Sequence, residues 1–517
     1  MNPGNDLSDQ VTNIGRLSRR QALRGLGLMG ALGVSGAIFV ACGSQAAPTP
    51  VPPTTAPGKP ATTTPAQATT APATAPTSAA QPTAAPTAAP AAAPAAAPTV
   101  APAATGMIGS ASAKTVITVW HTLGGGPDLT AFRSILTSYT KANTDVAFKL
   151  SFVPGSSATG PYVEKITAAI ASGSPPDIFH MNRPPQFGAA GALYALDDFI
   201  KADKNFNQED FFPAPWQRVT WLGKAYGVPV IVDSRGYWMN KKLFQEAGLD
   251  PSKPPATWDD LITVEQKLSQ KDSSGHYTRF GFTPLYGNAQ FYSYLYLAGG
   301  QLQDANYKVT FNDDHGVQAL EWLIKATDAT GGAQIVNTFE NSFATGANDP
   351  FLAGLVASKI DGCFGLSVIH QYAPNFEFAV APEPFPAGGH KATMVGGYNW
   401  SIAKQSKHAQ ESYNFLSWFS QPAQAVIFAQ ASANMPARRS ALNSDYIQKN
   451  PEIKFFFDAL SYGVPYSTAP WSQVMWDNVN VTATQDALYK RKSPKEALDA
   501  AASVVQAEVD KWINQKN

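Results

Sequence analysis

The stretch "TVITVWHTLGGGPDLTAFRSILTSY" (115–139) combines strand, loop and helix signals. Its first six residues are β-branched or aromatic and predict a strand, and the glycines that follow predict a loop. Next, Leu129, Phe132, Leu136 and Tyr139 recur at helical spacing and share one face of a predicted helix. The stretch therefore predicts a strand, a loop and a helix in that order.

The same order repeats downstream. "VAFKLSFV" (146–153) predicts a strand, "YVEKITAAIASG" (162–173) a helix and "DIFHMN" (177–182) a further strand. Alternating strands and helices predict an α/β fold with substantially parallel sheets. Because ligands of such sheets bind at the carboxyl ends of the strands, the expected binding edge includes residues 121–126 and 181–183.

Two later helices have explicit start signals. Thr257 in "PPATWDDL" is a predicted N-cap, with Asp260 three residues further on. Ser493 in "RKSPKEAL" is a second predicted cap, followed by Pro494 in the first turn and Glu496 three residues after the cap. Helices are therefore expected to begin at about residues 258 and 494.

The first 41 residues form a predicted export signal. Four arginines precede the apolar run "GLGLMGALGVSGAIFVA" (25–41), which is short for a membrane-spanning helix. "SRRQAL" (18–23) resembles the twin-arginine export signal. "FVAC" (39–42) resembles the bacterial lipobox, so Cys42 is the predicted site of lipid attachment. The alternative is an uncleaved anchor helix with an incidental thiol; either way, the protein is expected to be tethered outside the membrane.

From residue 43 to about residue 112 the chain is almost entirely alanine, proline, threonine and serine. Such a composition cannot bury enough apolar surface to offset chain entropy, so a disordered linker is predicted for residues 42–112. The linker would act as a flexible tether between Cys42 and the folded part of the chain.

Composition excludes several classes of protein. The 517 residues contain 38 basic and 38 acidic side chains, so no nucleic-acid partner is expected. The two cysteines, Cys42 and Cys363, lie far apart, and the seven histidines form no close pair of the kind that zinc needs. We therefore expect no metal and no cofactor. Cys363 is expected to be an inert, buried side chain.

Four stretches, taken in order, resemble the extracellular solute-binding proteins of family 1, the maltose-binding-like receptors of ABC importers. They are "ASGSPPDIFHMN" (171–182), "GKAYGVPVIVDSRGYWMNKKLFQEAGLDPSKPPATWDDL" (223–261), "FLAGLVASKIDGCFG" (351–365) and "GGYNWSIAKQSKHAQESYNFLSWFSQPAQAVIFAQASANMPARRSAL" (396–442). The second resembles the first interdomain crossing of the family. The last is the strongest match.

The resemblance implies two α/β lobes around an interdomain ligand cleft, as in periplasmic binding proteins. By analogy, residues 114–233 and 387–433 form the first lobe, and residues 234–386 and 434–517 the second. The ligand would contact both lobes and close the hinge between them. The implied partner is an ABC permease that reads the closed state, and the binding protein itself is expected to be a monomer.

A cleft for sugar needs aromatic faces and fixed polar groups. The candidate aromatic contacts are Tyr286, Phe364, Tyr398, Trp400, Trp471 and Trp476; Tyr398 and Trp476 are favoured, and about half of the set is expected to be core. The candidate polar contacts are His121, Thr122, Asn182, Arg183, Asp233 and Asn399. Asp233 has the alternative of a structural ion pair with Arg235.

The predicted ligand is a carbohydrate, either a mono- or an oligosaccharide. The runner-up is a polyol phosphate such as glycerol phosphate, because the glycine loop of "VWHTLGGGPD" at a helix N-terminus can receive an anion. A secreted hydrolase is disfavoured because the chain has no GxSxG motif, and its adjacent aspartates resemble caps and turns. A surface adhesin would not need the two crossings.

Overall fold

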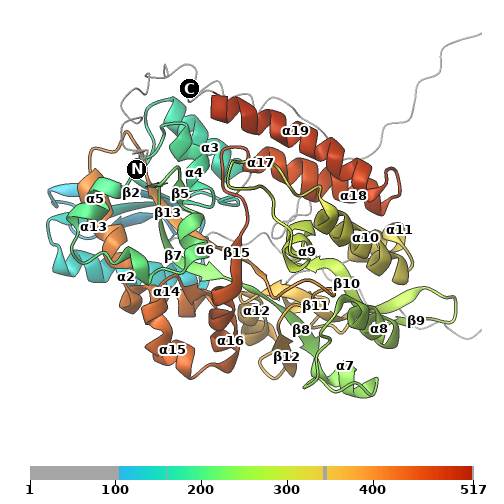
Figure 1. Ribbon diagram of the computed structural model, residues 1–517. Helices are drawn as coiled ribbons and strands as arrows, with labels where there is room; N and C mark the ends of the chain where they lie inside the picture. The colour runs from blue at the N-terminus through green and yellow to red at the C-terminus, as the bar shows by residue number, and fades with distance from the viewer. Residues whose placement is uncertain (1–103, 159, 342–345, 515–517) are drawn as a thin grey trace, which may run out of the picture. The chain divides into compact units, whose positions relative to one another are not determined.

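The computed structural model describes residues 104–158, 160–341 and 346–514. The predictions for the export signal, Cys42 and most of the linker lie outside these residues. The described part has a mixed α/β fold built on two main sheets (Figure 1). The predicted fold class is confirmed.

The first sheet has the strand order β1-β3-β2-β4-β13-β7-β14, with β15 paired to β13. Strand β2 runs parallel to β3 and β4, as expected, but β13 runs antiparallel to both β4 and β7. The sheet is therefore mixed. Its strands are β1 (Gly106–Ile108), β2 (Thr115–His121), β3 (Val146–Phe152), β4 (Ile178–Met181), β7 (Val228–Asp233), β13 (Thr393–Ile402), β14 (Met435–Pro436) and β15 (Gly463–Pro465).

The second sheet has the order β12-β8-β11-β10-β9. Strand β8 runs antiparallel to β11 and β12, whereas β10 and β11 are parallel. Its strands are β8 (Arg235–Asn240), β9 (Gln270–Lys271), β10 (Tyr277–Gly287), β11 (Val356–Gly362) and β12 (Phe378–Ala381). Only Ser234 separates β7 of the first sheet from β8 of the second.

Figure 1 shows helices α2, α13 and α14 beside the first sheet and α8, α9 and α10 beside the second. The long helix α19 lies along α17, η7 and α18. These helices are α2 (Gly126–Ala142), α8 (Trp258–Leu268), α9 (Phe291–Leu297), α10 (Asp314–Ala329), α13 (Ala409–Phe419), α14 (Pro422–Ser432), α17 (Ser472–Met475), the π-helix η7 (Trp476–Ala483), α18 (Thr484–Leu488) and α19 (Pro494–Asn514).

Shorter elements connect these layers. They are α3 (Pro161–Ala171), α4 (Pro184–Ala189), α5 (Asp197–Ala202), η3 (Gln208–Asp210), α6 (Pro213–Gln217), β5 (Thr220–Trp221), β6 (Lys224–Ala225), α7 (Lys241–Glu246), α11 (Ala333–Glu340), η4 (Gly346–Asn348), α12 (Gly365–Tyr372), η5 (Arg439–Asn443), α15 (Asp445–Gln448), α16 (Pro451–Ala459) and η6 (Leu460–Tyr462). Within the described ranges, no helix combines the length and apolar character needed to cross a bilayer.

The local signals in the sequence are confirmed. Leu129, Phe132, Leu136 and Tyr139 are all buried on one face of α2. The hydroxyl of Thr257 accepts a hydrogen bond from the Asp260 amide (3.1 Å), and the Asp260 carboxylate accepts one from the Thr257 amide (2.9 Å), which completes a capping box at α8. The carboxylate of Glu496 likewise accepts from the amide of Ser493 (3.0 Å) at the start of α19.

Candidate functional site

Three strands of the first sheet end at the same edge. Strands β2, β4 and β7 end at His121, Met181 and Asp233. Because β13 is antiparallel and pairs its Asn399 with Met181, its residues before Asn399 extend past the end of β4. The edge therefore brings together the ends of three strands and the middle of β13, and several of the sequence-predicted residues lie on it.

A buried arginine that the sequence analysis missed lies at this edge. Arg218 follows α6 and is fully buried. Its guanidinium donates to the side-chain oxygen of Asn182, to the Asn182 carbonyl (3.3 Å), to the Tyr466 hydroxyl (2.6 Å) and to the Gly397 carbonyl (3.4 Å). It also lies 4.5 Å from the centre of the Tyr466 ring. The Tyr466 hydroxyl in turn donates to Asn182 Oδ1.

Arg183 extends the same network toward the C-terminal helices. One of its terminal nitrogens donates to the side-chain oxygen of Gln473 in α17, and Gln473 donates to the Asp477 carboxylate (2.8 Å). Asn182, Arg183, Arg218, Tyr466 and Gln473 are called the Arg218 cluster below. The cluster connects the edge of the first sheet with residues 466–473, which follow β15.

Electrostatics at the cluster are dominated by burial. Burial lowers the pKa of Arg183, and the nearby charge of Arg218 acts in the same direction. The side chains of Tyr466, Tyr292 and Asp477 act in the opposite direction. Burial raises the pKa of Asp477, although Gln473 and Arg183 both oppose that shift.

Two histidines lie on the strands that end at this edge, His121 on β2 and His180 on β4. Nδ1 of His180, which the sequence analysis did not single out, lies 3.1 Å from the Thr122 hydroxyl, and its ring centre lies 4.3 Å from that of Tyr398. Burial lowers the pKa of His121 to about 4. Burial, with smaller contributions from His121 and Arg218, lowers the pKa of His180 to about 3. Both rings are therefore neutral at pH 7.

The predicted tryptophans lie in different environments. Trp400 is buried and stacks on Phe132, with ring centres 4.9 Å apart. Trp471 is buried against Trp221 (5.2 Å), and its indole nitrogen donates to Gln303 (2.9 Å). Side chains without exposed surface offer a ligand no stacking face, so these two belong to the core, the alternative expected for part of the set.

Trp476 differs from the other two tryptophans because it is only partly buried. It begins the π-helix η7, three residues after Gln473 of the Arg218 cluster. Its ring and the Tyr292 ring are nearly perpendicular, with ring centres 5.8 Å apart. Trp476 therefore presents an aromatic surface next to the cluster.

The strand β13 has an irregularity at the predicted contacts. Its register with β7 shifts between Tyr398 and Asn399. Tyr398 is partly buried, whereas Asn399 is 1% exposed. Gly397 has φ 129°, and a Cβ there would approach the Ile231 carbonyl oxygen to 2.4 Å. The glycine thus permits close packing against β7 and leaves its own carbonyl available to Arg218.

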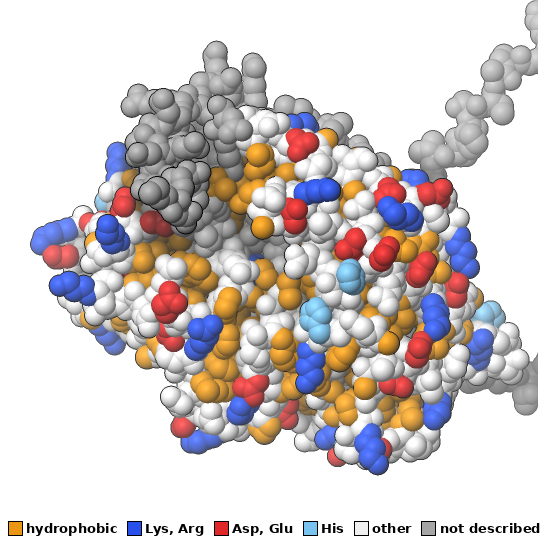
Figure 2. Space-filling view, in the orientation of Figure 1, with side chains coloured by type: hydrophobic (Ala, Val, Ile, Leu, Met, Phe, Trp, Pro, Cys, Tyr) orange, Lys and Arg blue, Asp and Glu red, His pale blue; other side chains and the backbone are white. Residues whose placement is uncertain are grey.

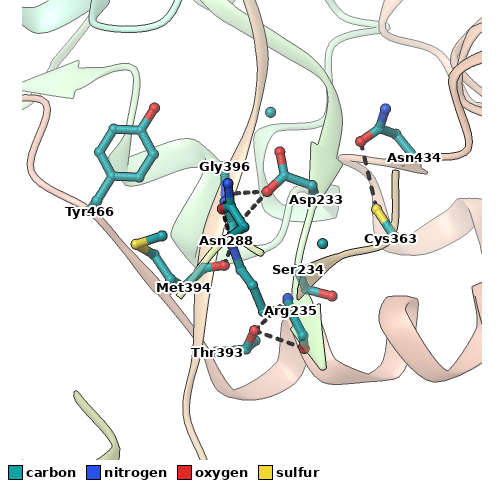
Figure 3. Close-up of polar contacts among 12 residues, drawn as sticks. Asp233, Ser234, Arg235, Asn288, Cys363, Thr393, Met394, Gly396, Asn434 and Tyr466 are labelled. Carbon is teal, nitrogen blue, oxygen red and sulfur yellow. Dashed lines mark hydrogen bonds and ion pairs between the residues drawn. The ribbon is translucent and has the colours of Figure 1, made fainter. Parts of the chain in front are cut away.

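Asp233 forms the ion pair with Arg235 that was its structural alternative (Figure 3). Arg235 also donates to Asn288 (3.0 Å) and to the Met394 carbonyl (2.8 Å), while Asp233 accepts from the Gly396 amide (3.1 Å). Cys363, also drawn in Figure 3, is fully buried, as expected. Asp233 therefore belongs to a network at the junction of the two sheets.

Tyr286 and Phe364 lie on the second sheet, Tyr286 within β10 and Phe364 shortly after β11. The Tyr286 hydroxyl lies 3.4 Å from an Asp349 carboxylate oxygen, and its ring centre lies 5.6 Å from the Lys359 ammonium. Phe364 precedes α12 and packs its ring over Gly362 at the end of β11.

Two surface hollows of the described residues lie away from the predicted site residues. A surface hollow of about 640 Å³ lies between α5 and α13, and another of about 430 Å³ lies beside α7; neither is lined by a predicted site residue. On the face drawn in Figure 2, lysine and arginine side chains are interspersed with aspartate and glutamate.

A family model agrees with this architecture. The model for bacterial extracellular solute-binding proteins matches residues 125–426, which is more than half of the chain. The chain belongs to this family. The resemblance in the four sequence stretches is thereby confirmed. The protein is a solute-binding component of an ABC importer, works outside the cytoplasm and is not an enzyme.

Solved and curated relatives are similar to this solute-binding protein over most of its length. The structure of CpMnBP1 with mannobiose bound is 30% identical, covers 76% of this chain and all of its own, and has a TM-score of 0.66. The maltodextrin-binding protein MdxE of Bacillus subtilis is 25% identical over 60% of this chain and 73% of its own. The sn-glycerol-3-phosphate-binding protein UgpB of Shigella flexneri is 23% identical over 67% of this chain and 80% of its own.

Proposed function

We propose that this solute-binding protein captures a carbohydrate between two lobes and delivers it to the permease when the lobes close. The observation that carries the proposal is the Arg218 cluster, where buried hydrogen-bond donors lie next to the partly exposed Trp476. A sugar ring needs a flat apolar face to stack on and fixed polar partners for its hydroxyls. The names of MdxE and of CpMnBP1 with mannobiose support the same class of ligand.

The proposed lobes are residues 114–233 with 387–433, and residues 234–386 with 434–517. Closure would turn about the Asp233–Arg235 network, because Ser234 alone separates the two sheets there. A ligand that contacts both lobes stabilises the closed state by binding it more tightly than the open one. Arg183 and Gln473 are suited to bind such a ligand from both sides, because Arg183 lies in the first proposed lobe and Gln473 in the second, and a hydrogen bond joins them.

Within the proposed site, Trp476 and Tyr398 stack on the sugar, and Thr122, Asn182 and Arg183 bind its hydroxyl groups. Tyr286 and Phe364 belong to the second lobe and line its side of the proposed cleft. The other predicted residues are buried and hold these groups in place from behind; they are His121, Asp233, Asn399, Trp400 and Trp471.

We also propose that the protein is anchored to the outer face of the membrane through lipid on Cys42. Each buried methylene group contributes about 0.8 kcal/mol, so several acyl chains hold the protein stably. Residues 43–112 would then let the folded part move around its permease.

A screen of the purified protein by thermal unfolding tests the proposed function. Mono- and oligosaccharides, polyol phosphates, peptides and metal ions are added separately, and a ligand at 100 times its Kd stabilises the folded state by about 2.7 kcal/mol. We expect stabilisation by a carbohydrate or its derivative. Stabilisation by peptides or metal ions alone would overturn the proposal, as would consumption of the stabilising ligand.

A further inference from the structure

The Arg218 cluster contains two buried positive charges. Arg183 is 6% exposed and Arg218 is fully buried. The hydrogen bonds of Arg218 go to an amide, two backbone carbonyls and a phenol, and that of Arg183 goes to the amide of Gln473. All of these acceptors are neutral. Each arginine also retains an Nε without a protein acceptor among the described residues.

The other buried cations of the described chain are paired differently. Arg235 pairs with Asp233, Lys359 with Asp361 at 2.7 Å, and Arg438 with Asp210 at 3.6 Å. By contrast, within residues 104–158, 160–341 and 346–514, neither Arg183 nor Arg218 has a carboxylate within 4.0 Å. The charge of Asp477 favours the ionised form of Arg183, but its carboxylate accepts a hydrogen bond from Gln473 and makes no ion pair with Arg183. Arg183 and Arg218 are therefore the exceptions to a rule that this protein otherwise follows.

Buried charges are costly unless they are paired, and arginine does not escape that cost by losing its proton. An anion beside Arg183 makes charge-assisted hydrogen bonds, which are stronger than those to a neutral hydroxyl, and the nearby charge of Arg218 attracts it as well. The neighbouring Tyr292 is 1% exposed and has a hydroxyl without a partner among the described residues, so a further hydrogen-bonding group is available.

We propose that the solute carries an acidic group, a carboxylate or a phosphate, that binds Arg183 and is also attracted by the charge of the fully buried Arg218. The transported ligand is then an acidic saccharide or a sugar or polyol phosphate, and not a neutral sugar. This inference rests on the proposed function and specifies the charge of its ligand.

Calorimetric titration of the whole protein with matched pairs tests the inference. The pairs are glucose and glucuronate, galactose and galacturonate, and glycerol and glycerol 3-phosphate. We expect the acidic member of at least one pair to bind about 10- to 100-fold more tightly than the neutral member. The sugar acids and the phosphate distinguish the two sources of the acidic group.

The outcomes separate the two proposals. Equal or tighter binding of neutral sugars, mannobiose included, would overturn the acidic-ligand inference and leave the proposed function standing. Binding of inorganic phosphate or acetate without any saccharide or polyol derivative would overturn the proposed function while supporting the acidic site.

The variant Asn182→Asp gives a sharper test with little change in shape. It places a carboxylate where Asn182 Oδ1 accepts from Arg218 and Tyr466. We expect the preference for the acidic over the neutral member to fall about 10-fold or more, because the protein now supplies the anion itself.

Arg183→Gln should reduce the same preference by removing one cation. Lys242→Gln, whose parent side chain is 77% exposed on α7, is the matched control and should leave the preference unchanged. An unchanged preference in both cluster variants would overturn the inference.

Discussion

The carboxylate of Asp233 pairs with the guanidinium of Arg235 across Ser234, the single residue between the last strand residue of one sheet and the first of the other. Both side chains are buried. The Ser234 hydroxyl also donates to the Phe456 carbonyl (2.8 Å), so the linking residue itself is held in place. The junction of the two sheets is therefore fixed by charge and by hydrogen bonds at three successive residues.

Replacing Asp233 with alanine should lower the free energy of unfolding by about 3–5 kcal/mol, because Arg235 would remain buried without its counterion. Denaturant unfolding measures this change. Asp445→Ala, which removes an exposed ion pair with Lys449, should change stability by less than about 1 kcal/mol. Equal effects of the two substitutions would show that the Asp233 pair contributes no more than a surface pair.

The tryptophan variants should separate stability from binding. Trp400→Ala should lower the free energy of unfolding by about 3–5 kcal/mol, because it empties a packed core position. Trp476→Ala should weaken ligand binding about 10-fold or more with a much smaller loss of stability, since its ring is partly exposed. Denaturation and calorimetry on both variants provide the comparison. Unchanged ligand affinity in Trp476→Ala would remove this residue from the proposed site.

Tyr466→Phe should weaken ligand binding about 10-fold, because the lost hydroxyl holds Asn182 and Arg218 in their relative positions. Calorimetric titration measures the change, and the free energy of unfolding should fall by only about 1 kcal/mol. Tyr372→Phe is the control, since that tyrosine is 46% exposed. If both variants bind as the parent does, the Tyr466 hydroxyl has no part in binding.

Glu383 should make stability depend on pH. Burial raises the pKa of this carboxyl to about 7 from an ordinary value of 4.5, although Arg235 and Thr393 oppose the shift. The folded state therefore holds a proton that the unfolded state has released, and the contribution of Glu383 to the free energy of unfolding falls as pH rises from about 4.5 to about 7.

Glu383→Gln removes that dependence. The free energy of unfolding of the variant, relative to the parent, should rise by on the order of 3 kcal/mol between pH 4.5 and pH 8. Unfolding measured at a series of pH values tests this. For Glu452→Gln, at an exposed position of α16, the free energy of unfolding should change with pH as it does in the parent. A pH-independent difference between Glu383→Gln and the parent would contradict the assignment.

Cys42→Ala should release the protein from the membrane fraction without changing its ligand affinity, because the thiol is the proposed site of acylation. Cell fractionation and mass spectrometry of the mature N-terminus test this. If the variant stays in the membrane fraction and the parent carries no lipid, the apolar run at 25–41 is the anchor instead.

Local signals in the sequence predicted local structure well. The caps at Thr257 and Ser493 depend on residues three positions apart, so their geometry follows from the sequence alone. The stretch around β13 was harder to interpret. Its register shift between Tyr398 and Asn399 depends on the pairing with β7, and this pairing determines which side chains are buried. The sequence therefore predicts Trp400 as a ligand contact, whereas in the structure it packs in the core.

Arg218 and His180 were missed for a related reason. The partners of Arg218, which are Asn182, Gly397 and Tyr466, lie 36, 179 and 248 residues away in the chain. A single arginine in the apolar stretch "PWQRVTWLG" was the only sequence signal. His180 lies within a predicted strand, and its contacts with Thr122 and Tyr398 require the neighbouring strands to be in place.

The π-helical segment η7 also bears on how this protein can tolerate a one-residue deletion. Each π turn closes five residues on, one more than an α turn, so loss of one residue between Asp477 and Ala483 could be absorbed by conversion to α-helix. Such a deletion would rotate Trp476 by about 100° relative to α18 and thereby change which side chain faces the proposed ligand site. One-residue length differences in this segment are therefore a route to new ligand preferences that a scan of point substitutions would not sample.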